Sequence, residues 1–144
     1  FFTSNFFRML QNNVRFRNEE CMVVGDDTHL QIVVWDADHY NPYYTISEQP
    51  NVMEKRNFKI EINQLQSGLY KIKHYTLDKE NGALYRVWQQ HNTTYGMDQE
   101  TIDYVNRISY PKLDIAEVEV EETLTYHLKV MTNSIHIIEV NKYV

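Results

Sequence analysis

Apolar and polar residues alternate with a period of two along much of this chain, which is typical of half-buried β-strands. In RNFKIEINQL, Phe58, Ile60 and Ile62 fall on one face and charged or polar residues fall on the other. The next segment, GLYKIKHYTLD, has a similar strand character. We therefore expect these two segments to form a hairpin joined through residues 66–68.

Further strands are predicted on either side of this segment. CMVVGDDTHLQIVVWDAD indicates two strands with a turn at 25–27, and the apolar run 32–35 is typical of a strand covered on both faces. AEVEVEETLTYHLKV and SIHIIEVNKYV predict the last strands, with a turn at 133–134. The apolar residues expected to form the core here are Val118, Val120, Leu124, Tyr126, Leu128, Val130, Ile135, Ile137, Ile138 and Val140.

Two segments have helical character instead. Near the N-terminus, Phe6, Phe7, Leu10 and Val14 recur at helical spacing after possible N-caps at 3–4. Further along, Asp98 is suited to be an N-cap, and the flanking Met97 and Ile102 occupy the positions of a hydrophobic staple. The fold class predicted is mostly β: an antiparallel β-sandwich with one N-terminal helix, within residues 1–18, and one internal helix, within a sandwich domain at 19–144.

Composition agrees with one folded β-rich domain. The chain has 144 residues, of which 42% are hydrophobic and 11 are Tyr. Its formal net charge of -6 disfavours nucleic-acid binding by this domain, and no apolar run is long enough to span a membrane. The single Cys21 excludes an internal disulfide and is compatible with a reducing compartment, so we expect a cytoplasmic protein.

Catalytic and metal sites are not indicated by any motif. Glu117, Glu119 and Glu121 alternate on a predicted strand, and a solvated strand face explains them better than a glycosidase pair does. The DADH sequence at 36–39 lacks the glycine and distal glutamate of an EF-hand, and turn formation explains its acids. We therefore expect no catalytic residue, no metal and no cofactor.

The histidines and the aromatic loop leave one binding alternative open. The remaining histidines, including His127 and His136 on predicted strands, have no metal-site or catalytic spacing and are expected on the surface. In the long segment after residue 36, aromatic rings could stack on a sugar, although packing of the loop onto the sandwich is the simpler interpretation. The possible sugar-stacking residues are Trp35, Tyr40, Tyr43 and Tyr44.

The segment HYTLDKENGALYRVWQQH, from His74, resembles the C-terminal region of glycoside hydrolase family 39, which includes β-xylosidases and is related to α-L-iduronidase. LQIVVWDADHYN and LTYHLKVMTNSIHIIEV resemble other strands of that region, so the resemblance covers about residues 20–140. The chain departs from the family between Trp88 and Asp98, where QQHNTTYGM replaces a short Gly-Pro loop.

This resemblance implies a (β/α)8 barrel that precedes the sandwich and carries the catalytic glutamates, so no catalytic residue carries over. Residues 1–18 resemble the last helix of that barrel, and the chain is interpreted as a fragment of a longer protein. The same module also ends some AraC-type transcription regulators of Gram-positive bacteria, which have a helix-turn-helix domain upstream.

The function expected is therefore that of a non-catalytic accessory domain, in a regulator or in a β-xylosidase, with a structural or sensing role. Its expected partners are the barrel or regulator domains of the same chain. The alternatives are a carbohydrate-binding module of a xylan-degrading enzyme and a stand-alone enzyme. Tyr85 and Trp88 stand three residues apart, so they are expected on one face of a helical turn, as structural anchors that pin it to the sandwich.

Overall fold

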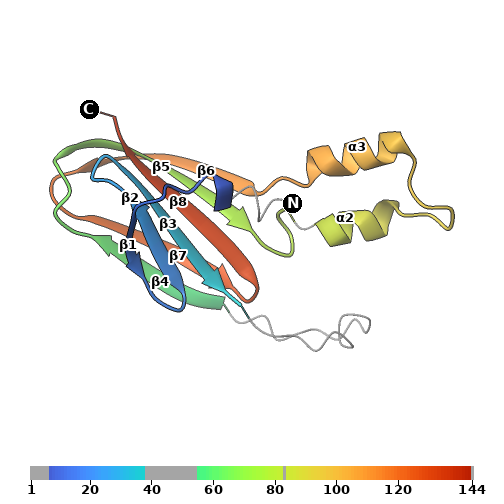
Figure 1. The fold of residues 1–144 in the computed structure, drawn as a ribbon, viewed down its shortest axis with the longest axis horizontal. Helices are drawn as coiled ribbons and strands as arrows, with labels where there is room; N and C mark the ends of the chain where they lie inside the picture. The colour runs from blue at the N-terminus through green and yellow to red at the C-terminus, as the bar shows by residue number, and fades with distance from the viewer. Residues whose placement is uncertain (1–6, 38–54, 83, 144) are drawn as a thin grey trace.

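The fold is a β-sandwich of two antiparallel sheets with a helical hairpin projecting from one end (Figure 1). The computed structural model describes residues 7–37, 55–82 and 84–143. Its larger sheet has six strands in the order β1-β2-β3-β8-β5-β6, and the smaller sheet pairs β4 with β7. The predicted fold class, a mostly β antiparallel sandwich, is confirmed.

The strand and helix bounds follow the chain in order, with the hairpin inserted between β5 and β6. The six-stranded sheet consists of β1 (Val14–Arg17), β2 (Cys21–Gly25), β3 (His29–Asp36), β5 (Gly68–Leu77), β6 (Lys112–Val120) and β8 (Ser134–Lys142). The two-stranded sheet consists of β4 (Lys55–Ile62) and β7 (Leu124–Met131). The hairpin consists of α2 (Leu84–His91) and α3 (Gln99–Ile108).

The main core lies between the two sheets and follows the period-two pattern. The core-facing residues of β4 are Phe58, Ile60 and Ile62, as the alternation predicted. The fully buried core residues are Leu30, Ile32, Val34, Leu65, Tyr70, Ile72, Val120, Leu124, Leu128, Val130, Ile138 and Val140. A second, smaller cluster around Val33 and Ile137 lies on the opposite face of the six-stranded sheet, so β3 is covered on both faces, as its continuous apolar run predicted.

The predicted hairpin of β4 with β5 is wrong, because the two strands belong to different sheets. β4 pairs with β7, whereas β5 pairs with β6 and β8. The connection crosses between the sheets: Leu65 is buried, and its backbone N–H donates to the carbonyl of Glu122 at 2.9 Å. Alternation identifies the buried face of a strand, but it does not identify the neighbouring strand.

The predicted N-terminal helix to Val14 is also wrong in its extent. Helical geometry is present at Phe7 and Arg8, whereas β1 begins at Val14. The intervening residues lie on the outer face of the six-stranded sheet, where Leu10 packs against the smaller core cluster. The amide side chain of Gln31 holds this segment by donating to the Met9 carbonyl at 2.9 Å and accepting from the Gln11 N–H at 2.8 Å. Hydrogen bonds to the sheet replace those of the expected helix.

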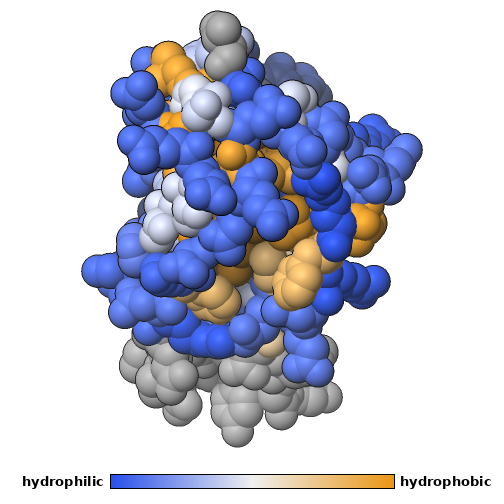
Figure 2. Space-filling view, turned by 90° about the vertical axis from the view of Figure 1, so that its left-hand side faces the viewer, coloured by the Kyte–Doolittle hydropathy of each residue, from blue (hydrophilic) through white to orange (hydrophobic). Residues whose placement is uncertain are grey.

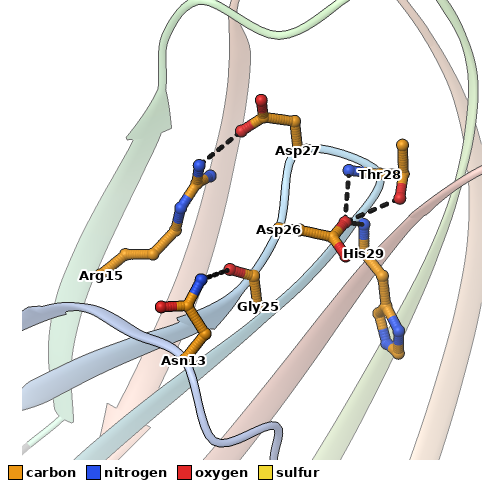
Figure 3. A network of polar contacts seen from close by, with 7 residues as sticks. All are labelled: Asn13, Arg15, Gly25, Asp26, Asp27, Thr28 and His29. Atoms are coloured by element: carbon orange, nitrogen blue, oxygen red, sulfur yellow. Dashed lines mark hydrogen bonds and ion pairs between the residues drawn. The ribbon is translucent and has the colours of Figure 1, made fainter.

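The β2–β3 turn is held by an aspartate and requires a glycine (Figure 3). One carboxylate oxygen of Asp26 accepts from the backbone N–H groups of Thr28 and His29, at 2.8 and 2.9 Å, and from the Thr28 hydroxyl at 2.7 Å. Gly25 has a φ of 112°, a conformation that side chains disfavour. The predicted turn at 25–27 is therefore confirmed, with Asp26 as its hydrogen-bonding centre.

The sequence predicted one internal helix, whereas the described part of the chain has two, α2 and α3, and α3 is the one that begins where the sequence predicted it. The Asp98 side chain caps α3 by accepting from the Thr101 N–H at 2.8 Å. Val105 is buried, whereas Ile102 and Ile108 keep 40% and 44% of their surface exposed, so α3 covers only part of its apolar side. Away from the hairpin, hydrophilic residues cover most of the end of the sandwich, with apolar surface visible between them (Figure 2).

Candidate functional site

A cluster of polar side chains lies inside the sandwich, between β5 and β8 of the larger sheet and β7 of the smaller one. We call Tyr126, His74, His136 and Ser134 the histidine cluster. The two imidazoles face each other, with His74 Nε2 and His136 Nδ1 2.8 Å apart. Tyr126 Oη lies 3.0 Å from His74 Nδ1, and Ser134 Oγ lies 3.1 Å from His136 Nε2. The cluster therefore forms one chain of contacts that joins the two sheets.

The strands place these side chains on the core face because of their period of two. On β8, Ser134 and His136 share the face of the core residues Ile138 and Val140. On β7, Tyr126 lies between the buried Leu124 and Leu128 on the inward face. The cluster thus continues the apolar core toward one end of the sandwich.

Burial changes the protonation of the cluster. His136 is only 3% exposed, and burial together with the neighbouring His74 lowers its pKa to about 4. Burial also lowers the pKa of His74, although nearby Asp114 opposes the effect. Burial raises the pKa of the Tyr126 hydroxyl. Both imidazoles therefore favour the neutral form more than solvent-exposed histidines do.

The order Ser134, His136, His74 has the contacts of a nucleophile, a base and a group that orients the base. However, Ser134 is 1% exposed, and its hydroxyl donates to the Met131 carbonyl at 2.6 Å. A substrate could not approach a hydroxyl buried in this way. The geometry therefore supports a structural cluster and gives no basis for nucleophilic catalysis.

The prediction that His136 lies on the surface is wrong, whereas the matching prediction for His127 is confirmed. The continuous run IHII hides which of its residues face the core. The signal that could have found it is the spacing along the strand: Ser134, His136, Ile138 and Val140 occupy every second position and must share a face.

A second candidate region is an apolar hollow of about 540 Å³ on the outer face of the six-stranded sheet. Trp35 and Ile135 line it, and Arg17 and Asp36 add charge to its lining. Of the possible sugar-stacking residues, only Trp35 is within the described part of the chain. Tyr40, Tyr43 and Tyr44 lie outside the described residues, so the sugar-stacking set stays a prediction.

The acidic residues considered for metal binding or for a catalytic pair are ion-paired or exposed to solvent where the structure describes them. Asp36 lies 3.7 Å from the guanidinium of Arg56, while 38–39 lie outside the described residues. Glu117 and Glu119 are exposed on β6, as expected of a solvated face. Within residues 7–37, 55–82 and 84–143, no group of three His, Cys, Asp or Glu side chains is arranged to hold a metal ion. No helix in that part of the chain is long and apolar enough to cross a membrane.

The proposed anchor residues fall in the helical hairpin. Trp88 lies on α2, is 41% exposed, and lines a hollow together with Met97, Ile102 and Val105. Tyr85 also falls in α2, but its side chain lies outside what the structure describes. The surroundings of Trp88 lead us to propose that it anchors α2 on α3, at a distance from the core between the sheets.

Replacing Trp88 by Ala should therefore loosen the hairpin more than the sandwich. We expect a loss of about 1–2 kcal/mol, because a half-exposed indole contributes less than a fully buried one. Hydrogen exchange should accelerate in α2 and α3 and stay unchanged in β3 and β8. Tyr95→Ala is the matched control, since Tyr95 is fully exposed. Equal acceleration of exchange in the sandwich strands would contradict a local role for Trp88.

Comparison with known proteins gives two kinds of similarity. No family model matches the chain. In sequence, 143 residues are 46% identical to part of an uncharacterized HTH-type transcriptional regulator of Staphylococcus aureus strain MRSA252, and 45% identical to part of its counterpart in strain COL. These matches cover 99% of this chain but 19% of each relative, so the chain spans about a fifth of their length.

In structure, the chain is similar to parts of larger enzymes. A monomeric β-xylosidase from Caulobacter crescentus matches with a TM-score of 0.77 and 13% identity, over 99% of this chain and 30% of the enzyme. A GH39 enzyme from Xanthomonas axonopodis matches with a TM-score of 0.78 and 9% identity, over 98% of this chain and 29% of the enzyme. At these identities the similarity establishes a shared sandwich fold and nothing more.

Proposed function

We propose that this chain is a non-catalytic accessory domain of a longer bacterial transcription regulator of the helix-turn-helix type, acting in the cytoplasm. The observation that carries the proposal is the 46% identity of nearly the whole chain to a segment that makes up 19% of such a regulator. The fold shared with the GH39 enzyme supports a sandwich of the family-39 type within that regulator. DNA binding belongs to another domain, since this chain has a net charge of -6.

The surface best suited to contact the rest of the regulator is the outer face of the six-stranded sheet. Leu113 and Ile115 of β6 lie opposite Tyr75 and Lys73 of β5, on the same face as the smaller core cluster. They are 44% and 56% exposed. Exposed apolar residues on the same sheet face as an apolar hollow are typical of surfaces that pack on another protein unit. We propose that this face packs on a preceding domain and transmits a structural or sensing signal.

The proposal is tested by Ile115→Lys in the chain alone and in the longer regulator. In the isolated chain the exposed position should tolerate lysine, with stability within about 0.5 kcal/mol of the original. In the regulator, the same change should lower the temperature of unfolding and alter transcription from a reporter promoter. Thr125→Lys, at an exposed position on β7, is the control. If the regulator carrying Ile115→Lys behaves like the control, this face is not the docking surface.

A carbohydrate-binding module is the second candidate, because Trp35 lines an apolar hollow of about 540 Å³. Aromatic rings bind the apolar faces of sugars, so xylo-oligosaccharides are the ligands to test. Titration to millimolar sugar should give a saturable change in tryptophan fluorescence that Trp35→Phe abolishes and Trp88→Phe retains. The accessory role predicts no saturable change, and no release of product from an aryl xyloside.

A further inference from the structure

The hydrogen positions in the histidine cluster follow from its geometry, starting at Ser134. Ser134 Oγ lies 2.6 Å from the Met131 carbonyl, which can only accept, so the serine hydroxyl donates its proton there. The same oxygen must then accept at its contact of 3.1 Å with His136 Nε2. A neutral His136 therefore carries its hydrogen on Nε2 and leaves Nδ1 as an acceptor.

The remaining contacts are then determined one by one. Because His136 Nδ1 accepts, His74 Nε2 must donate across the 2.8 Å contact. A neutral His74 consequently accepts at Nδ1, where the Tyr126 hydroxyl donates at 3.0 Å. All these hydrogen bonds therefore donate in the same direction along the cluster. The chain begins at Tyr126 on β7, passes through the imidazoles on β5 and β8, and ends at the Met131 carbonyl at the end of β7. Each imidazole uses its one donor and its one acceptor.

An extra proton can be held by either ring of the cluster. On His74 it would sit at Nδ1, where Tyr126 can rotate its hydroxyl and accept. A protonated His136 beside a neutral His74 would also keep every contact, because His74 could then carry its hydrogen on Nδ1 and accept at Nε2. Only when both rings are charged do two N–H donors oppose each other across the 2.8 Å contact. Thr76 Oγ1 is 3.4 and 3.5 Å from the two facing nitrogens, too far to relieve this opposition well. The pair can therefore hold one extra proton, and His136 must remain neutral once His74 is charged.

The charged groups around the cluster do little to favour a charged His136. Asp114 and Lys112 of β6 face the His74 and Tyr126 side, but their ion pair of 2.9 Å partly cancels their fields. Asp78, beyond β5, favours a charged His136 from a distance. Asp36 of β3 lies opposite Ser134 and is paired with Arg56 of β4. Among the described residues, no carboxylate is hydrogen-bonded to either imidazole.

We propose that the histidine cluster is a pH-sensitive joint between the two sheets, which holds β7 on β5 and β8 while at most one of the two imidazoles is charged and loosens when His136 is protonated beside a charged His74. This inference concerns the sandwich itself and stands whether or not the chain belongs to a regulator. The response should lie below neutral pH, in mildly acidic solution.

The sign and the pH window follow from the lowered pKa of His136. In the unfolded chain the imidazole titrates near its ordinary value of 6.5, whereas in the folded chain it titrates at about 4. The unfolded state therefore binds more protons between these values, and the contribution to stability is complete above pH 6.5. It is lost progressively as the pH falls toward 4, where the unfolding equilibrium constant should have risen at least about tenfold from this group.

Nuclear magnetic resonance of the chain with labelled histidines tests the assignment directly. At pH 7.5, both His74 and His136 should carry their hydrogen on Nε2, with slow exchange of the His136 Nε2–H. On titration, His136 should remain neutral to well below pH 6, and amide exchange in β7 should accelerate once it protonates. A His136 hydrogen on Nδ1, or an ordinary titration near pH 6.5 with no change in β7, would overturn the proposal.

Variants provide a second measurement that does not depend on removing either histidine. Tyr126→Phe removes the donor to His74 Nδ1, and Ser134→Ala removes the acceptor of His136 Nε2. Ser134→Ala should alter which nitrogen of His136 carries the hydrogen and shift the midpoint pH of the acid response. Tyr126→Phe should alter which nitrogen of His74 carries the hydrogen and also shift that midpoint. His127→Gln, at an exposed position on β7, is the control and should leave the profile unchanged. An acid response that is identical in the original chain and in all three variants would refute the proposed joint.

Discussion

Replacing Gly25 by Ala should be among the most destabilising single changes in this chain, with a loss of about 3 kcal/mol or more. A Cβ at this position would lie 2.1 Å from the backbone carbonyl oxygen of His29, far inside van der Waals contact. The φ of 112° adds strain for any residue with a side chain. Because the obstructing atom belongs to the backbone, the turn itself must move to relieve the clash.

Moving that carbonyl would disturb the strands that the turn joins. The His29 carbonyl accepts from the Asp26 N–H at 3.0 Å, and Gly25 is paired in register with Leu30. β3 in turn pairs with β8 along eight residues, so a displaced turn affects the centre of the larger sheet. Denaturant unfolding followed by circular dichroism should show a lower midpoint, and thermal unfolding should begin about 10 °C earlier.

Gly96→Ala separates the clash from the backbone strain. Gly96 also has a positive φ, 87°, but a Cβ there would meet no atom within 4 Å. Its substitution should therefore cost about 1 kcal/mol, from strain alone. Similar losses for the two variants would show that the contact with the His29 carbonyl contributes little, and that the turn can shift without disturbing β3.

Local features of the fold were predictable because adjacent residues determine them. The turn at 25–27 depends on Gly25 and on the side chain of Asp26, both of which act within a few residues. The start of α3 depends on Asp98, which reaches Thr101. Such signals are read directly from the chain, since the partners of each hydrogen bond lie three or fewer residues apart.

Features that depend on distant residues were not predictable in the same way. β4 and β5 each show the alternation of a half-buried strand, and nothing in either pattern indicates that β7 and β8 are the true neighbours. The N-terminal segment has helical spacing, but the buried side chain of Gln31 offers its backbone better-placed partners. In both cases contacts across the sheet prevail over the local pattern.

The histidine cluster illustrates why the candidate site could not be read from motifs. His74 and His136 are 62 residues apart, and Tyr126 comes from the other sheet. A sequence motif detects metal ligands or catalytic bases that lie close together on one helix, strand or loop. This cluster forms only when the two sheets pack together. Only the inward orientation of His136 was accessible, through its shared face with Ile138 and Val140.

Replacing Gln31 by Leu should destabilise the chain by about 2–4 kcal/mol, although it replaces a polar buried side chain with an apolar one. Gln31 is 1% exposed, and its amide bonds the Met9 carbonyl, the Gln11 N–H and the Glu139 carboxylate, the last at 3.1 Å. Leucine fills a similar volume but leaves these three groups without their partner. Glu139 is only 7% exposed, so its carboxylate cannot simply turn to water.

The loss should be concentrated at the N-terminal segment. Hydrogen exchange at residues 9–13 should accelerate strongly in Gln31→Leu, because the side chain that fixes this segment on the outer face is gone. Exchange in β7, which lies in the other sheet, should change only as much as global stability does. Denaturant unfolding measures the loss in the free energy of unfolding, and hydrogen exchange shows which residues are destabilised.

The matched control is Gln99→Leu, which makes the same chemical change at an exposed position. Gln99 donates to Asp103 at 3.0 Å on the surface of α3, where water replaces the lost bond, so the cost should stay within about 0.5 kcal/mol. Glu139→Gln is the complementary variant, since its side-chain carbonyl can still accept from Gln31. If Gln31→Leu is as stable as Gln99→Leu, the N-terminal segment is held on the sheet by the apolar contacts of Leu10, and the amide is dispensable.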